Sequence, residues 1–87
     1  KNKIVPVPYF EAESQTFTDN LSIKLGSVIG GDIYYSINDS NEKIYNSPII
    51  ITANANISCR IKKEEKWSKQ VSAKYLLFNI INLINTI

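Results

Sequence analysis

The stretch DIYYSINDSNEKIYNSPI, residues 32–49, decides the fold. Apolar and polar side chains alternate through its first half, with Ile33, Tyr35 and Ile37 on one side of the alternation. A period of two over β-branched and aromatic residues is typical of a half-buried β-strand. The run Asn-Asp-Ser-Asn that follows is typical of a turn, and Pro48 introduces another apolar run. The stretch therefore predicts a strand, a turn and a return of the chain toward the core.

The same alternation recurs over residues 21–25, 57–61 and 71–75, and residues 49–51 form a shorter apolar run. Clusters of Gly, Asn and Lys-Glu separate these runs, as turns separate strands. Short strands at this spacing, with no long helical pattern between them, predict an all-β chain folded as a small β-sandwich.

The alternation also predicts the core. The inward positions are Leu21, Ile23, Leu25, Ile33, Tyr35, Ile37, Ile57, Cys59, Ile61, Val71, Ala73 and Tyr75. Burying one large aliphatic side chain contributes about 1.5–3 kcal/mol, so this set is an adequate core for one domain. Cys59 is the only cysteine, which excludes an internal disulfide. We interpret it as a small buried hydrophobic residue, because the chain has no histidine to activate a thiol.

The composition is that of an ordinary globular domain, with 44% hydrophobic and 21% charged residues and a formal net charge of +2. The basic residues gather between Arg60 and Lys66, but Glu64 and Glu65 interrupt them. Nucleic-acid-binding proteins usually carry a strong, one-sided basic patch. We therefore expect no nucleic-acid partner.

The C-terminal sequence LLFNIINLINTI, residues 76–87, breaks the alternation. Its apolar residues would share one face of a helix, but the last strand could equally continue into it. We interpret residues 1–76 as the sandwich and residues 77–87 as an apolar extension or the start of a following domain. The segment is too short and too rich in Asn to span a membrane. Because the chain has no methionine and opens on Lys-Asn-Lys, we expect it to be a piece of a longer protein.

Spaced positions along residues 6–76 together resemble a known family. They are Pro8-Tyr9-Phe10, Phe17, residues 21–25, the run IYYSINDS at 33–40, Tyr45 with Pro48-Ile49, residues 57–61, Trp67-Ser68 and Tyr75. This pattern resembles the chitobiase/β-hexosaminidase C-terminal domain family, whose hallmark is I-Y-Y-T-L-D-G-S followed by Y and P-I. The resemblance implies an immunoglobulin-like antiparallel β-sandwich of about seven strands. The chain departs from the pattern at the turn, where Asp39 replaces the glycine of the family but still tolerates turn geometry.

The resemblance also implies a function. Such modules are non-catalytic accessory domains of larger bacterial carbohydrate-active enzymes, here a hexosaminidase-like glycoside hydrolase that is secreted, periplasmic or displayed on the cell surface. The expected role is that of a spacer, or of a surface that packs on neighbouring domains of the same polypeptide. The family offers no catalytic residue and no cofactor to carry over to this chain.

The residues themselves predict no catalytic centre. Glycoside hydrolysis needs two carboxylates about 5–10 Å apart across a cleft, and the acidic residues here are scattered over predicted turns and edges. Without histidine there is no Ser-His-Asp or Cys-His arrangement. Calcium prefers oxygen ligands, which makes Asp39, Asn41 and Glu42 weak metal candidates. Their spacing matches no complete calcium loop, and we predict a plain turn there.

Carbohydrate binding is the alternative function, since the apolar face of a sugar stacks on an exposed aromatic ring. The candidates are Tyr34, the outward residue of its strand, Trp67, beside a predicted hairpin, and Tyr9, at the N-terminal edge. We favour the opposing interpretation, in which Trp67 caps one end of the core or packs on a neighbouring domain, because the sequence does not place these rings on one surface. A weaker third interpretation is a stalk repeat of a surface protein.

Overall fold

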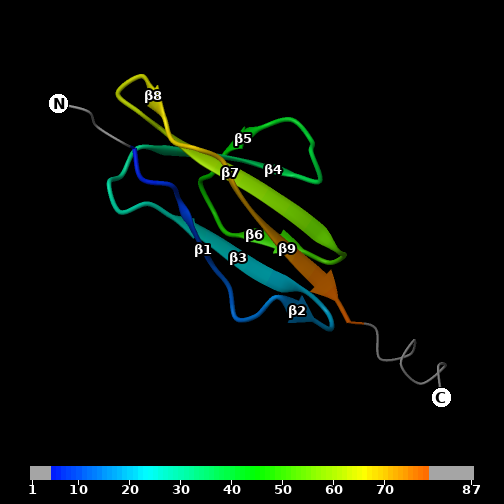
Figure 1. Cartoon of the computed structure of the whole chain (residues 1–87). Coiled ribbons are helices and arrows are strands. Elements are labelled where there is room, and N and C mark those ends of the chain that lie inside the picture. Colours follow the sequence, from blue (N-terminus) through cyan, green and yellow to red (C-terminus); the bar gives the residue numbers. More distant parts are fainter. Residues whose placement is uncertain (1–4, 79–87) are drawn as a thin grey trace, which may run out of the picture.

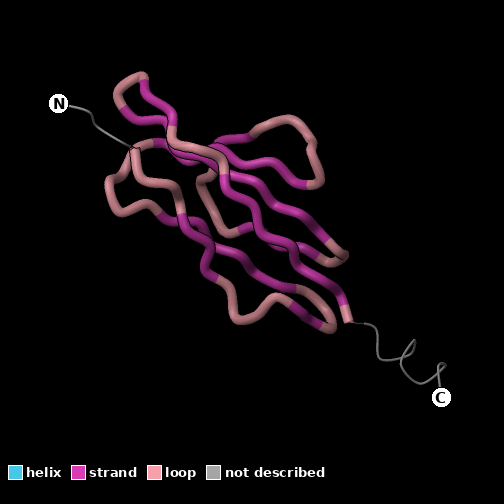
Figure 2. Tube along the Cα trace, viewed as in Figure 1, coloured by secondary structure: helices cyan, strands magenta, loops and turns pink. Residues whose placement is uncertain are grey.

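The computed structural model describes residues 5–78, and over this range the chain forms two packed β-sheets (Figure 1). The strands are β1 (Tyr9–Glu11), β2 (Thr16–Phe17), β3 (Leu21–Gly26), β4 (Asp32–Ile37), β5 (Lys43–Ile44), β6 (Ile49–Ile51), β7 (Ala55–Lys63), β8 (Lys66–Trp67) and β9 (Val71–Leu77). Loops and turns make up the remainder of this range (Figure 2). No helix long and apolar enough to cross a membrane occurs among these residues.

The strand order is that of an immunoglobulin-like sandwich. The smaller sheet has the order β1-β3-β6, and the larger has the order β2-β9-β7-β4-β5 with β8 also paired to β7. In immunoglobulin terms, β1, β3 and β6 take the places of strands A, B and E, while β9, β7, β4 and β5 take those of G, F, C and C′. This confirms the predicted small β-sandwich.

Two details differ from the prediction. The described range contains nine strands rather than about seven, because β2, β5 and β8 are two-residue strands. The pairing is not wholly antiparallel, since β2 runs parallel to β9. Strand β9 ends at Leu77, the first residue of the segment 77–87, for which the sequence left open a continuation of the last strand. The rest of the predicted apolar extension, residues 79–87, lies outside the described residues.

The core forms from the residues that the alternation placed inward. Those buried are Leu21, Ile23, Leu25, Ile33, Ile57, Cys59, Ile61 and Tyr75, and those partly buried against them are Tyr35, Ile37, Val71 and Ala73. Phe17, Ile49, Ile51 and Ala55 complete the core. They lie in short strands or at the first residue of β7, where too few residues are present for a period to be visible.

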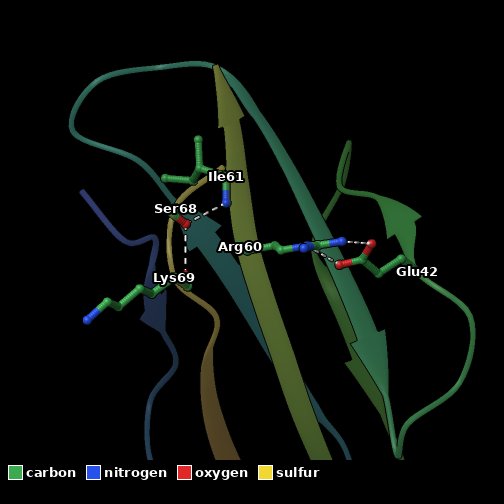
Figure 3. A network of polar contacts seen from close by, with 5 residues as sticks. All are labelled: Glu42, Arg60, Ile61, Ser68 and Lys69. Carbon is green, nitrogen blue, oxygen red and sulfur yellow. Dashed lines mark hydrogen bonds and ion pairs between the residues drawn. The ribbon is translucent and has the colours of Figure 1, made fainter. Parts of the chain in front are cut away.

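Ser68 closes a gap beside the long strand β7. On this edge of β7, β9 pairs with residues 55–59 and β8 with residues 62–63. The backbone groups of Ile61 are satisfied by Ser68, whose backbone N donates to the Ile61 carbonyl oxygen at 2.8 Å and whose Oγ accepts from the Ile61 N at 2.9 Å. Its hydroxyl then donates to the Lys69 carbonyl oxygen at 2.8 Å (Figure 3). Buried backbone groups need such partners, so Ser68 fixes β8 against β7.

In the described range, two turns use left-handed backbone at residues other than glycine. Asn38 and Asp39, after β4, have φ of 52° and 64°, and Glu64 and Glu65, between β7 and β8, have φ of 50° and 67°. Positive φ at both central residues characterises the type I′ turn, which suits the twist of a hairpin. Asn and Asp tolerate this conformation, which agrees with the turn predicted at Asp39. Glu does not share this tolerance, so the β7–β8 turn is strained.

Replacing Ile57 with alanine tests the centre of the core. The Ile57 side chain has no exposed surface, so its truncation leaves a cavity and lowers the free energy of unfolding by about 2–5 kcal/mol. Ile50→Ala is the matched control, because Ile50 in β6 is 60% exposed and its truncation costs about 1 kcal/mol or less. Urea unfolding measures both variants. Equal losses in the two variants would contradict the assignment of inner and outer faces.

Glycine in the β7–β8 turn is expected to stabilise the domain. Glu65→Gly removes about 1–2 kcal/mol of left-handed strain from the folded state. It also costs about 0.5–1 kcal/mol, because glycine raises the conformational entropy of the unfolded chain. The free energy of unfolding should therefore rise by about 0.5–1 kcal/mol. Glu13→Gly is the control, because Glu13 is exposed and is not among the described residues with positive φ. Thermal unfolding compares the variants. If Glu65→Gly destabilises as much as Glu13→Gly, the turn is not strained.

Candidate functional site

The outer face of the larger sheet brings two of the predicted aromatic residues together. Tyr34 lies opposite Arg60 in the β4–β7 ladder, and Trp67 lies opposite Lys62 in the β7–β8 ladder. Directly opposed residues point to the same side of a sheet, and residues 60 and 62 share the outer side of β7. The ring centroids of Tyr34 and Trp67 lie 5.3 Å apart with the rings tilted by 57°, a favourable aromatic contact.

Trp67 lies outside the core and is 41% exposed. The interpretation of this residue as a cap over the core is therefore wrong. The reason is the short β7–β8 hairpin. Strand β8 pairs with residues 62–63 of β7, past the residues that pair with β9. Trp67 lies opposite the outward residue Lys62, which points the indole toward the outer face. The sequence did not reveal this register.

Arg60 fixes the position of the indole. Its Cζ lies 3.8 Å from the centroid of the Trp67 ring, and the Nζ of Lys62 lies 5.5 Å from the same point. Arg60 also donates from Nε to Glu42 Oε2 at 2.8 Å and from Nη2 to Oε1 at 3.0 Å (Figure 3). These hydrogen bonds raise the pKa of Arg60, so the guanidinium stays charged. A fork of this kind orients the guanidinium even where a surface ion pair adds little stability.

These contacts define a surface that we call the aromatic platform: Tyr34, Glu42, Arg60, Lys62 and Trp67. A guanidinium 3.8 Å from the ring centroid leaves no room for water on that side of the indole. The exposed part of Trp67 therefore lies away from the guanidinium. The platform thus presents an immobilised aromatic ring with polar groups at its border.

Tyr9 does not join the platform. It lies in β1, in the smaller sheet, where it pairs with Gly26 of β3. A Cβ at Gly26 would overlap the Tyr9 ring, so this tyrosine lies flat over the glycine on the outer side of that sheet. It is 49% exposed, but as a single ring. The sequence correctly indicated its exposure and did not indicate that it belongs to a different sheet.

Two of the three predicted metal ligands have other structural roles, and the third, Asn41, lies in the loop between β4 and β5. Glu42 is paired with Arg60, and Asp39 is a turn residue with positive φ. The neighbouring Asn38 accepts a hydrogen bond from the backbone N of Asn56 through Oδ1 at 2.9 Å. Between residues 5 and 78, no group of three or more His, Cys, Asp or Glu residues is arranged to hold a metal ion. Directly after β4, Asn38 and Asp39 form a turn.

A hollow of about 560 Å³ lies beside β1 and β3 on the smaller sheet, lined by Glu11, Ala12, Glu13, Asn20, Leu21, Ser22 and Lys24. No aromatic ring is among these residues, so the hollow offers no stacking surface.

Comparisons with family models, characterised proteins and solved structures find no match to the chain. The family resemblance thus stays a prediction, and the role of the platform has to be argued from its own geometry.

Cys59 is expected to be unreactive in the folded domain. It is 1% exposed, and burial raises the pKa of its thiol to about 12. At pH 8, Ellman's reagent should modify the unfolded chain quickly and the native chain hardly at all, whereas a Val28→Cys variant reacts in the native state because Val28 is 75% exposed. Equal native rates at the two sites would show that the core opens to reagents.

The same pKa difference predicts how stability depends on pH. The ordinary thiol pKa is 9.0, whereas the folded thiol stays protonated to about 12. Above pH 9 the unfolded chain therefore binds fewer protons than the native one, and the free energy of unfolding falls as the pH rises toward 12. Below pH 9 the thiol is mostly protonated in both states, so the contribution of Cys59 to the free energy of unfolding is fully present.

Proposed function

We propose that the chain is a non-catalytic accessory module of a larger secreted carbohydrate-active enzyme, a hexosaminidase-like glycoside hydrolase, and that it holds neighbouring domains at a fixed spacing. One observation carries the spacing role. The described chain enters the sandwich at the end that bears β8 and leaves at the opposite end, where β9 finishes (Figure 1). A module entered at one end and left at the other separates its neighbours by its own length.

The exit of the chain is firmly held. Strand β9 pairs with β7 and with β2. The backbone N of Leu76 donates to the Gln15 carbonyl oxygen at 2.8 Å, and that of Phe78 donates to the Phe17 carbonyl oxygen at 2.6 Å. These bonds extend the ordered ladder to the last described residue. A spacer needs this property, because a frayed end would leave the direction of the next segment undefined.

The positions behind the family resemblance have structural tasks. Tyr45 packs edge-on against Tyr35, with ring centroids 6.3 Å apart. Ser68 closes the gap beside β7, and Asp39 has the left-handed conformation for which the family uses glycine. Motif residues that build the fold rather than surround a cleft support an accessory role.

The spacing role predicts a single, well-defined distance between the two ends. Spin labels at Val7→Cys and Phe78→Cys, both exposed in the native domain, should give one narrow distribution centred at about 30 Å or more, because the nine residues of β7 alone span about 3.3 Å each. Buried Cys59 should remain unlabelled. A pair at Val7→Cys and Val28→Cys is the short-distance control, because both residues are exposed and each lies two positions beyond the Tyr9–Gly26 pair of the antiparallel β1–β3 ladder.

A broad distribution between the ends would contradict the spacing role. The assignment to an enzyme is checked separately, by sequencing the reading frame on both sides of the chain. A frame without a carbohydrate-active catalytic domain would contradict it.

A second function, carbohydrate binding, is favoured by a different observation. Tyr34 and Trp67 share one exposed face, with ring centroids 5.3 Å apart. Spacing uses the two ends of the sandwich, whereas binding would use the outer face of the larger sheet. The two functions are therefore compatible, and each can fail without the other.

A further inference from the structure

We propose that the end of the sandwich where the chain leaves docks an acidic side chain of the neighbouring domain, with the carboxylate held in a hollow on the outer face of the larger sheet. This hollow, which we call the exit hollow, has a volume of about 260 Å³ and is lined by Asn38, Asn54, Ala55, Asn56, Lys74 and Leu76. The inference rests on the proposed spacing role, and it names the contact that fixes the direction of the next domain.

The exit hollow and the aromatic platform are separate parts of one face. Asn56 lies opposite Lys74 in the β7–β9 ladder, so their side chains point to the same side of the sheet. Asn56 also shares the outer side of β7 with Arg60, because every second residue of a strand points to the same side. The four residues between Asn56 and Arg60 correspond to about 13 Å along the strand. The exit hollow therefore uses none of the residues of the platform.

Two asparagine side chains in the exit hollow are oriented by backbone groups. The Oδ1 of Asn38 accepts from the backbone N of Asn56 at 2.9 Å, and the Oδ1 of Asn54 accepts from the backbone N of Leu77 at 2.6 Å. An asparagine whose oxygen is engaged in this way presents its NH₂ group as a donor. Among residues 5–78, neither of these two NH₂ groups has a hydrogen-bond partner. The hollow is therefore lined by two amide donors whose orientation is already set.

The charge of the exit hollow favours an anion. Within the described range, Lys74 is the one charged residue in its lining, and no carboxylate lies within ion-pair distance of the Lys74 ammonium. Asp39 follows Asn38 in the turn but is not part of the lining, so it weakens the attraction without occupying the hollow. A carboxylate only accepts hydrogen bonds, and bonds between charged partners are the stronger ones. Amide donors beside an ammonium thus suit a carboxylate.

The surroundings of the exit hollow favour a protein partner. Leu77 packs on the core, so its neighbours Leu76 and Phe78 point to the outer side, where each is 45% exposed. Leu76 lines the hollow, and the described chain ends at Phe78. Apolar side chains next to polar groups are typical of protein interfaces. The chain itself holds a domain joined at this end close to the hollow, so that a modest contact is enough to fix its direction.

The test is an NMR titration of the 87-residue chain, labelled with ¹⁵N. The probe is glutamate with both ends blocked, as the N-acetyl N-methylamide, and the comparison is the same derivative of glutamine, which has the same shape without the charge. We expect the glutamate probe to shift the side-chain NH₂ signals of Asn38 and Asn54 saturably, together with the backbone amides around Asn56 and Lys74. The glutamine probe should bind at least about fivefold more weakly.

Three variants locate the site. Asn54→Asp keeps an oxygen that accepts from the backbone N of Leu77, but it replaces the free NH₂ donor with a negative charge, so it should weaken binding by about tenfold or more. Lys74→Gln should weaken binding by about threefold or more, and it keeps the test valid if Asn54→Asp fails to fold. Lys69→Gln is the matched control. It removes the same charge from an exposed lysine outside the hollow, and it should change the affinity by less than about twofold.

Several outcomes would overturn the inference. One is the absence of any saturable shift, and another is a glutamine probe that binds as tightly as the glutamate probe. Equal losses in Lys74→Gln and Lys69→Gln would show attraction by net charge alone. Signals of the hollow that move on dilution without a probe would make a second copy of the chain the occupant. Each of these results leaves the spacing role standing, because that role is measured between the two ends of the sandwich.

Discussion

Strand β7 has to be buried on one face and hydrogen-bonded along both edges, and the remainder of the domain meets this requirement. Its inward residues Ile57, Cys59 and Ile61 are the centre of the core. One edge is covered by β4 alone, while the other is shared between β9 and β8. The two partners on the shared edge do not meet, and the Ser68 hydroxyl and backbone occupy the space between them. The hairpin that presents Trp67 therefore forms because β7 continues past the residues that pair with β9.

The platform is the other half of the same alternation that builds the core. Each inward residue of β7 has an outward neighbour, so burying Ile61 places Arg60 and Lys62 on the outer face. A slip of one residue would exchange the two sets and put both cations into the core, which is why the register is strongly specified. The core and the candidate site are thus two consequences of one pattern, and neither can be shifted independently of the other.

The sequence predicted the parts of the molecule that carry a period or a turn signature. The longer strands, most of the core and the turn at Asp39 belong to this class. Two-residue strands such as β2 and β5 have no visible period, and the parallel pairing of β2 with β9 joins distant segments. The Arg60–Glu42 pair, 18 positions apart, depends on how the chain returns after β4. The contact between Tyr34 and Trp67 requires two registers at once, and periodicity determines neither of them.

The opposite positions of chain entry and exit have a mechanical consequence. A pull on the two ends of the described chain acts along the strands, whereas the hydrogen bonds of a sheet run across them. Strand β9 would then have to slide past β7 and β2 with all its bonds loaded together, instead of peeling away one bond at a time. The parallel β2–β9 pair lies at the point where such a load enters the sandwich. We expect a domain with this connectivity to resist a pull along its strands better than a pull that separates the strands one bond at a time.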